Sequence, residues 1–189
     1  MKSFVAFAAL AATALAAPAF AQAQSLALPA SLAPVSYSAS AGYTGISDAG
    51  NNLGAVTLRA GADLGKYAGV EGEGAFGVAD GGASFQGASV KTHLNYEYAA
   101  YAVARYPVLA NANLFARVGY GHEELHASAS ANGSTVSATA GTDSLNYGVG
   151  GQYMFNGKDG LRLEWTRFDF RHDHVSPADS WTLSYVRKF

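Results

Sequence analysis

The chain has 189 residues, of which 49% are hydrophobic and only 14% are charged, and its net charge at pH 7 is −2. The charged fraction is well below the ~25% of ordinary soluble domains, and without a basic excess a nucleic-acid partner is not expected. No cysteine is present, which excludes disulfides and thiol chemistry.

The first 21 residues have the pattern of a secretory signal peptide. A positive charge at Lys2 precedes the apolar run Phe4–Ala17, and the small-x-small triplet Ala19-Phe20-Ala21 follows. The run is shorter than the ~20 apolar residues that a membrane-spanning helix needs, so a cleaved signal is favoured over an anchor. The predicted organisation is a signal peptide over residues 1–21, a short periplasmic segment over 22–34 and one domain over 35–189.

From Val35 onward, apolar and polar residues alternate in eight segments, and helical spacing is nowhere sustained. Successive side chains of a strand point to opposite faces, so each segment has one apolar face. In the clearest segment, Leu94, Tyr96 and Tyr98 belong to the apolar face, and Glu97 points the other way. The eight predicted strands span residues 35–43, 56–64, 70–78, 93–106, 114–120, 145–155, 161–166 and 181–189.

A chain without an apolar helix can face lipid only as a closed barrel, in which every backbone group is paired around the ring. The apolar faces carry too many aromatic side chains to fit inside eight strands, which excludes a soluble barrel with an apolar interior. We therefore predict an all-β fold, namely an eight-stranded antiparallel up-and-down transmembrane β-barrel. Its short turns and both termini would be periplasmic, and its long polar loops, over residues 44–53, 79–92, 122–143 and 171–179, would be extracellular.

The inward faces of the predicted strands carry four basic and four acidic side chains. Buried ions are tolerable only when they are paired, so this balance predicts a barrel filled by salt bridges; the alternative is a narrow gated pore in which one pair changes partner. Arg117 and either Glu71 or Glu73 are the expected partners for Glu97 and Arg105. The eight residues of this predicted network are Arg59, Glu71, Glu73, Glu97, Arg105, Arg117, Arg162 and Glu164.

Two short motifs lack the context that their chemistry needs. The run from His122 to His126 matches the H-E-x-x-H zinc-protease pattern, but that pattern requires a helix, and on a strand the two histidines lie ~13 Å apart. His174-Val-Ser176 is similar to the His-x-Ser of barrel enzymes that deacylate lipid A, but Pro177 follows directly and the acid spacing differs. We predict no catalytic residue, no metal and no cofactor.

Asn132-Gly133 is a strong signal for a two-residue hairpin, because both positions tolerate a positive φ. Alternating small residues flank it on both sides, over 127–131 and 134–138. We predict that the fifth and sixth strands continue above the membrane as a ribbon that turns at this dipeptide.

The stretch from Asn95 to Gly121, with Ala104-Arg-Tyr-Pro107 and Leu114-Phe-Ala-Arg-Val-Gly-Tyr-Gly121, resembles the small outer-membrane β-barrel proteins of the OmpA, OmpX and opacity-protein type. The closing segment is similar to the last-strand signal that the barrel-assembly machinery reads, although Arg187 stands where that signal often has an aromatic residue. The residues that carry this signal are Trp181, Leu183, Tyr185 and Phe189. No peptidoglycan-binding domain is expected after the barrel.

The resemblance implies a protein of the outer membrane of a Gram-negative bacterium. We expect a structural and surface-interaction role, such as envelope integrity or loop-mediated adhesion. The alternative is a narrow gated pore for small solutes or ions, and the remote alternative is a lipid A-modifying enzyme. The expected partners are outer-membrane lipids and lipopolysaccharide, the barrel-assembly machinery and periplasmic chaperones during biogenesis, and an extracellular ligand at the loops.

Overall fold

A computed structural model describes residues 35–48, 51–85, 88–131, 134–171 and 176–189. The predicted signal peptide and periplasmic segment lie outside these ranges. Over the described residues, no helix is long and apolar enough to cross a membrane.

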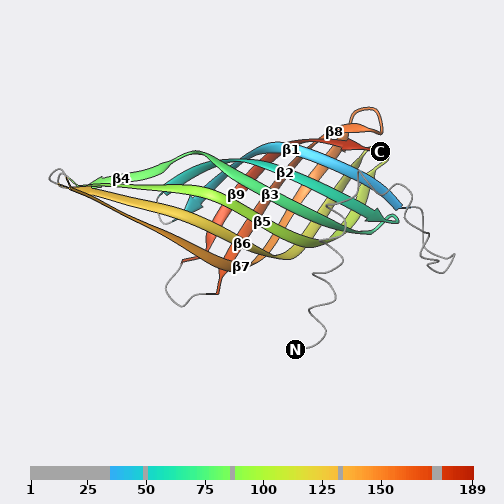
Figure 1. Ribbon diagram of the computed structural model, residues 1–189. Coiled ribbons are helices and arrows are strands. Elements are labelled where there is room, and N and C mark those ends of the chain that lie inside the picture. Colours follow the sequence, from blue (N-terminus) through green and yellow to red (C-terminus); the bar gives the residue numbers. More distant parts are fainter. Residues whose placement is uncertain (1–34, 49–50, 86–87, 132–133, 172–175) are drawn as a thin grey trace, which may run out of the picture.

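The described residues form strands that alternate with tight connections (Figure 1). The strands are β1 (Val35–Asp48), β2 (Asn51–Leu64), β3 (Ala68–Ala79), β4 (Gly81–Phe85), β5 (Ala88–Leu109), β6 (Ala112–Ala131), β7 (Ser134–Met154), β8 (Asp159–Phe170) and β9 (Ala178–Lys188).

Eight of these strands close an antiparallel ring. Neighbours in the chain pair with each other except β3 and β4. β3 pairs with β5, and β1 pairs with β9 to complete the circle. β4 continues the line of β3 beyond Asp80 and pairs only with β5. The predicted eight-stranded barrel is therefore confirmed, and β4 is an extension of its third strand.

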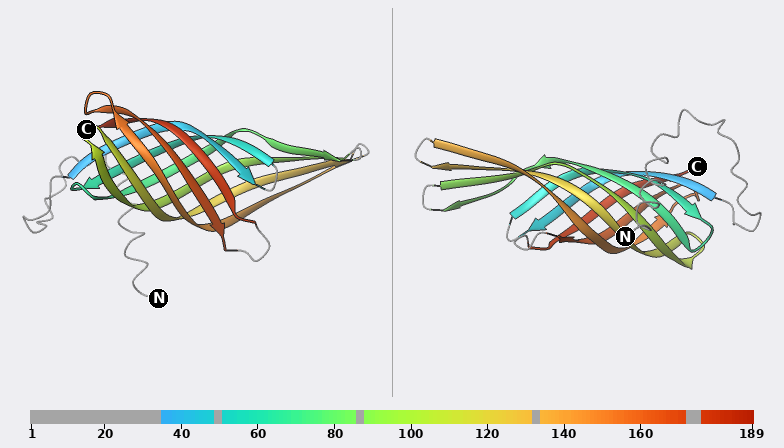
Figure 2. Two further views of the ribbon diagram at one scale, coloured as in Figure 1. Left: turned by 180° about the vertical axis from the view of Figure 1, so that it is seen from behind. Right: turned by 60° about the horizontal axis from the view of Figure 1, so that its bottom comes forward.

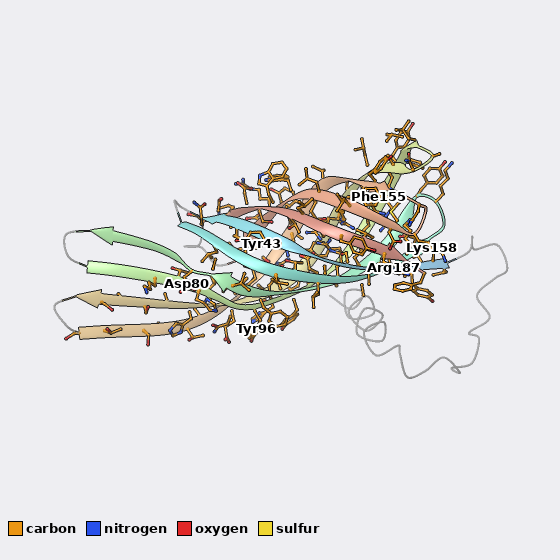
Figure 3. All side chains as sticks on the ribbon, turned by 90° about the horizontal axis from the view of Figure 1, so that it is seen from above. Tyr43, Asp80, Tyr96, Phe155, Lys158 and Arg187 are labelled. Atoms are coloured by element: carbon orange, nitrogen blue, oxygen red, sulfur yellow. The ribbon has the colours of Figure 1, made fainter. Side chains whose placement is uncertain are left out.

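Polarity is inverted relative to a soluble protein, with apolar side chains outside and charged side chains inside. In β8, Leu161 and Leu163 are exposed, whereas Arg162, Glu164 and Thr166 between and after them are buried. Exposed aromatic residues occur toward both ends of the barrel, with Tyr43 near one end and Phe155 near the other (Figure 3). This arrangement matches an apolar belt with aromatic residues at both membrane interfaces.

The prediction that Leu94 faces outward is wrong. The register between β5 and β6 shifts between Leu94 and Tyr96, which marks a β-bulge at Asn95. An extra residue reverses the inward and outward alternation beyond it. Leu94 is therefore buried inside the barrel end, where it packs with Ala55 and Ala75.

The long loops predicted at one end are mostly β-structure. β1 and β2 stay paired up to Asp48 and Asn51, and β6 and β7 up to Ala131 and Ser134. The two-stranded extension of β6 and β7 predicted around Asn132-Gly133 is thus present, although those two residues lie outside the described ranges. The small polar residues that alternate along these segments encode strands that extend past the membrane.

β4, the first part of β5, the last part of β6 and the first part of β7 project together from the barrel (Figure 2). We call this four-stranded projection the ribbon, and define it as residues 81–85, 88–96, 122–131 and 134–143. The C-terminus and the beginning of β1 lie at the opposite end of the barrel (Figure 1).

The opposite end has the predicted short turns. Gly65 and Gly157 have φ values of 80° and 78° there, a left-handed conformation that glycine adopts without steric cost. In the turn after β7, the side-chain oxygen of Asn156 accepts hydrogen bonds from the backbone N–H groups of Lys158 and Asp159. Such local bonds stabilise a turn without a longer loop.

One inward glycine shapes the lumen. Gly119 on β6 stands directly opposite Tyr101 on β5, and a methyl group at residue 119 would meet the Ala100 carbonyl oxygen and the Tyr101 ring. The missing side chain lets the Tyr101 ring lie against the barrel wall, where the Arg117 guanidinium covers it at 4.0 Å from the ring centroid.

We expect Gly119→Ala to destabilise the barrel by about 1–3 kcal/mol through overpacking. The measurement is urea unfolding of the protein in detergent micelles. Gly45→Ala is the matched control, because nothing lies within 4 Å of the added methyl group there. An equal loss of stability in both variants would contradict this account of Gly119.

Candidate functional site: the charge network of the lumen

The eight charged residues of the predicted network all point into the lumen. Seven of them are at most 8% exposed, and Arg105 is half-buried near the turn end. They come from five strands because their positions fall on the inward phase of each alternation. By strand they are Arg59 on β2, Glu71 and Glu73 on β3, Glu97 and Arg105 on β5, Arg117 on β6, and Arg162 and Glu164 on β8.

One ion pair crosses the whole lumen. Arg162 on β8 donates from Nη1 and Nη2 to the two carboxylate oxygens of Glu71 on β3, at 2.7 and 3.0 Å. In the ring, β5, β6 and β7 separate these strands on one side, and β2, β1 and β9 separate them on the other. The two strands therefore face each other across the barrel, and this bidentate pair bridges the lumen.

In a second layer, Arg59 and Arg117 both contact the same two carboxylates, Glu73 and Glu164. Glu73 accepts from Arg59 Nε at 2.8 Å and from Arg117 Nη1 at 2.7 Å. Glu164 Oε1 lies 2.5 Å from Arg59 Nη2 and 3.0 Å from Arg117 Nη2. Glu164 also accepts from Arg162 Nε at 2.7 Å, so Glu73 contacts two guanidinium groups and Glu164 contacts three. The buried charges thus neutralise one another with several charge-assisted hydrogen bonds.

Toward the turn end the network continues through Arg105. Its Nη2 donates to Glu71 Oε1 at 2.8 Å, and its Nη1 pairs with Asp63. Asp63 also accepts from Lys188 Nζ at 3.1 Å. Arg105 and Lys188 line a cavity of about 310 Å³ at this end. The space is thus bounded by the charge network on its inner side.

Two of the guanidinium groups lie over aromatic rings, which fixes their orientation. Arg162 lies 3.8 Å from the centroid of the Phe115 ring, as Arg117 does over Tyr101. The Tyr101 hydroxyl accepts from Asn146 Nδ2 at 3.1 Å and donates to Glu73 at 3.4 Å. These contacts restrict the arginine rotamers and keep their hydrogen-bonding edges directed at the carboxylates.

Glu97 does not form the ion pair with Arg117 that was expected. Over the described residues it has no cation within salt-bridge distance, and its Oε1 has no hydrogen-bond partner. Its cross-strand neighbour is another acid, Glu123 on β6, which accepts from Ser144 at 3.0 Å. Arg117 is directed instead at Glu73, Glu164 and Thr166. The ribbon end of the lumen therefore carries two adjacent carboxyl groups outside the Arg–Glu network.

Sequence reasoning missed several members of this interior. Glu123 was assigned to a loop, although it continues the inward phase of β6. Asp63 lies four residues after Arg59 and so on the same inward face of its predicted strand. This alternation could have identified it as a member of the network. Lys188 could be recognised only through the pairing of β1 with both β2 and β9, which brings it beside Asp63.

The zinc-protease pattern has the geometry expected of a strand. His122 and His126 both lie in β6, so they cannot share a metal in the manner of a helix. Over the described residues, no group of three or more His, Cys, Asp or Glu side chains is arranged to hold a metal ion. Of the His-x-Ser motif, His174 lies outside the described ranges, and Ser176 is exposed.

Comparison with known proteins gives a decisive match. The family model of the outer membrane protein beta-barrel domain matches residues 7–189. The chain belongs to this family. It is a small β-barrel of the outer membrane of a Gram-negative bacterium. No curated protein sequence matches the chain.

Solved structures share the fold at low sequence identity. Ail, the attachment invasion locus protein of Yersinia pestis, is 21% identical with a TM-score of 0.53, over 82% of this chain and 97% of Ail. The N-terminal β-barrel of Pseudomonas aeruginosa OprF is 12% identical with a TM-score of 0.56, over 82% and 97%. Neisserial surface protein A is 14% identical with a TM-score of 0.51, over 83% and 97%.

The expected assembly signal lies on the outer surface of the closing strand. Trp181, Leu183 and Tyr185 are exposed on alternate positions of β9, and Phe189 is 73% exposed. The backbone N–H of Phe189 donates to the Tyr37 carbonyl at 2.9 Å, so the last residue still contacts β1. A role for these four residues in recognition by the assembly machinery stays a prediction.

We expect Arg117→Ala to destabilise the barrel by about 3–5 kcal/mol, because it leaves Glu73 and Glu164 with less compensation in a buried site. Unfolding by urea in liposomes measures the loss. Arg187→Ala is the control: its ion pair with Asp159 is 3.4 Å long and its side chain is 56% exposed, so it should cost less than about 1 kcal/mol. Comparable losses would show that the lumen pairs contribute no more than a surface pair.

For Glu97 we expect the opposite sign. Burying a carboxyl group that has an acid opposite it and no cation nearby costs free energy, so Glu97→Gln should raise the free energy of unfolding by up to about 1 kcal/mol. Glu73→Gln, which removes an acceptor shared by two arginines, should lower it. The same urea titration distinguishes the two, and a loss of stability in Glu97→Gln would mean that the carboxylate has a stabilising partner.

Proposed function

We propose that this outer-membrane barrel has a structural and surface-interaction role, in which the lumen stays closed and the ribbon binds partners outside the cell. The observation that carries the proposal is the ribbon. Short turns of such barrels are periplasmic and long connections are extracellular, so the ribbon end faces the exterior. The ribbon extends beyond the lipid and is not needed to span the membrane.

The outer edge of the ribbon suits strand addition. Over residues 134–141, β7 pairs with β6, whereas pairing with β8 begins only at Ser144. Natural edge strands are usually protected by charges or proline, yet residues 134–141 of this edge contain neither. Val136 is 74% exposed on it. An extended segment of a partner could add to this edge through main-chain hydrogen bonds.

The pore alternative is disfavoured by the pair of Arg162 and Glu71, which spans the lumen with two hydrogen bonds. For a gate, the arginine would have to exchange Glu71 for another acceptor. Its Nε already donates to Glu164 at 2.7 Å, so Arg162 is held at three nitrogen atoms. A lumen filled by side chains explains this arrangement more simply than a gated pore does.

We also propose that the chain is not an enzyme, because Pro177 directly follows Ser176 and the acid spacing around the His-x-Ser motif differs from that of the lipid A-deacylating barrels. The partners in this proposal are outer-membrane lipids and lipopolysaccharide around the apolar belt, the barrel-assembly machinery and chaperones during biogenesis, and a ligand of the ribbon. The name of Ail, an attachment invasion locus protein, is consistent with attachment as the role of the ribbon.

A binding screen tests the role of the ribbon. The barrel in nanodiscs would be presented to lipopolysaccharide, extracellular-matrix proteins and epithelial cell surfaces, alongside a variant that lacks residues 127–130 and 135–138. These residues are paired with one another, so their removal shortens the β6–β7 hairpin of the ribbon in register and leaves the sequences of β4 and β5 unchanged. We expect a ligand that the shortened variant loses and that Val136→Lys weakens, because a charge on the edge disfavours strand addition.

Planar-bilayer recordings test whether the lumen is closed. The proposal expects little or no stable conductance from the wild-type barrel. Large, steady channels, together with equal binding by the full and shortened ribbons, would replace it with the pore function.

A further inference from the structure

Two histidines face each other at the base of the ribbon. His93 on β5 is the direct cross-strand partner of His126 on β6. Directly opposed side chains point to the same face, with Cβ atoms ~4.5–5.5 Å apart. At this spacing two imidazole rings can reach one ion with the ~2.0–2.1 Å bonds that zinc makes to histidine nitrogen.

The ring of His93 is oriented by an acid. Its Nδ1 lies 2.7 Å from Oδ1 of Asp80, and a carboxylate only accepts hydrogen bonds, so Nδ1 carries the proton. In the neutral ring this leaves the lone pair on Nε2. A carboxylate that holds the far nitrogen of an imidazole is the usual outer-shell arrangement of a metal-binding histidine.

The ring of His126 is fixed through the same atom. Its Nδ1 lies 2.9 Å from the hydroxyl oxygen of Thr139 on β7. Nδ1 of each ring is thus engaged by a neighbouring residue, Asp80 or Thr139, and in the tautomer in which the Thr139 hydroxyl accepts from Nδ1 the lone pair of His126 is on Nε2, as it is in His93. A hydrogen bond at one ring nitrogen determines which nitrogen can bind a metal.

The fold creates this site through two irregularities. The third strand of the ring is interrupted at Asp80, between β3 and β4, and β4 resumes with Gly81 opposite Thr92. This places Asp80 beside His93 at the base of the ribbon (Figure 3). On β5, the bulge at Asn95 buries Leu94 and so directs its neighbour His93 to the other face. His93 remains accessible, with 40% of its side chain exposed.

We propose that His93 and His126 form a two-histidine site for a divalent transition-metal ion such as Zn²⁺ or Cu²⁺, with Asp80 as the residue that positions His93. Water completes the coordination, in keeping with the lack of a cluster of three ligand side chains over the described residues. The site differs from the zinc-protease reading, because the partner of His126 is on the adjacent strand and His122 takes no part. A bound ion would join β5 to β6 where the ribbon leaves the barrel.

Isothermal titration of Zn²⁺ into the untagged barrel in detergent at neutral pH tests the proposal. The background carries His172→Ala and His174→Ala, so that these two histidines contribute no binding. We expect one saturable site, at least tenfold weaker in His93→Ala and in His126→Ala, and about 10–100-fold weaker in Asp80→Asn because the ring loses its orienting acceptor. His122→Ala is the matched control and should bind as the background does. Its imidazole has a comparable carboxylate partner, Asp143, at 2.7 Å, but stands opposite Tyr98 and not a histidine.

Electron paramagnetic resonance of bound Cu²⁺ provides an independent measurement. Coupling to two imidazole nitrogens is expected in the background protein and to one in each single histidine variant. The gel mobility of unboiled samples establishes that every variant is folded. The proposal is overturned if no saturable binding occurs, if His93→Ala and His126→Ala bind like the background, or if His122→Ala abolishes binding.

Discussion

The hydrocarbon core of the membrane offers no water to the backbone, and this constraint determines the rest of the molecule. Each unpaired N–H or C=O group in lipid costs several kcal/mol, so the strands must pair on both sides until they form a ring. Closure then decides the placement of side chains. Every strand has one face toward lipid and one toward a narrow lumen, and apolar residues are therefore most stable on the outside.

The lumen follows from this inversion. It is too narrow to hold bulk water, yet its walls are the polar faces of all eight strands. Ionised side chains are acceptable there because carboxylates contact more than one guanidinium group, with Glu73 shared by two arginines and Glu164 by three. Glu97 and Glu123, which lie outside this shared arrangement, mark the boundary where the interior passes into the ribbon.

Much of this could be predicted from the sequence, because a period of two is a strong signal wherever one face meets lipid. Arg59, Glu71 and Arg162 were placed in the lumen by alternation alone. Leu94 was misplaced because a bulge adds one residue without a marker in the sequence, and every side chain beyond it changes face. The ribbon was partly missed for a different reason: where both faces meet water, small polar residues encode strand and loop alike. Pairs across the lumen, such as Arg162 with Glu71, depend on barrel closure and cannot be predicted from the alternation within one strand.

The contact between β1 and β9 has a consequence for the order of events in biogenesis. Residues of β1 pair with residues of β9, as Ser38 does with Lys188, so the ring cannot close until β9 has been synthesised. Until then both terminal strands present unpaired edges, which favour aggregation. Pairings so distant in sequence also form slowly, because the chain must lose the entropy of a very long loop first. The barrel therefore closes only once β9 is available, and the pairing of β1 with β9 removes both exposed edges.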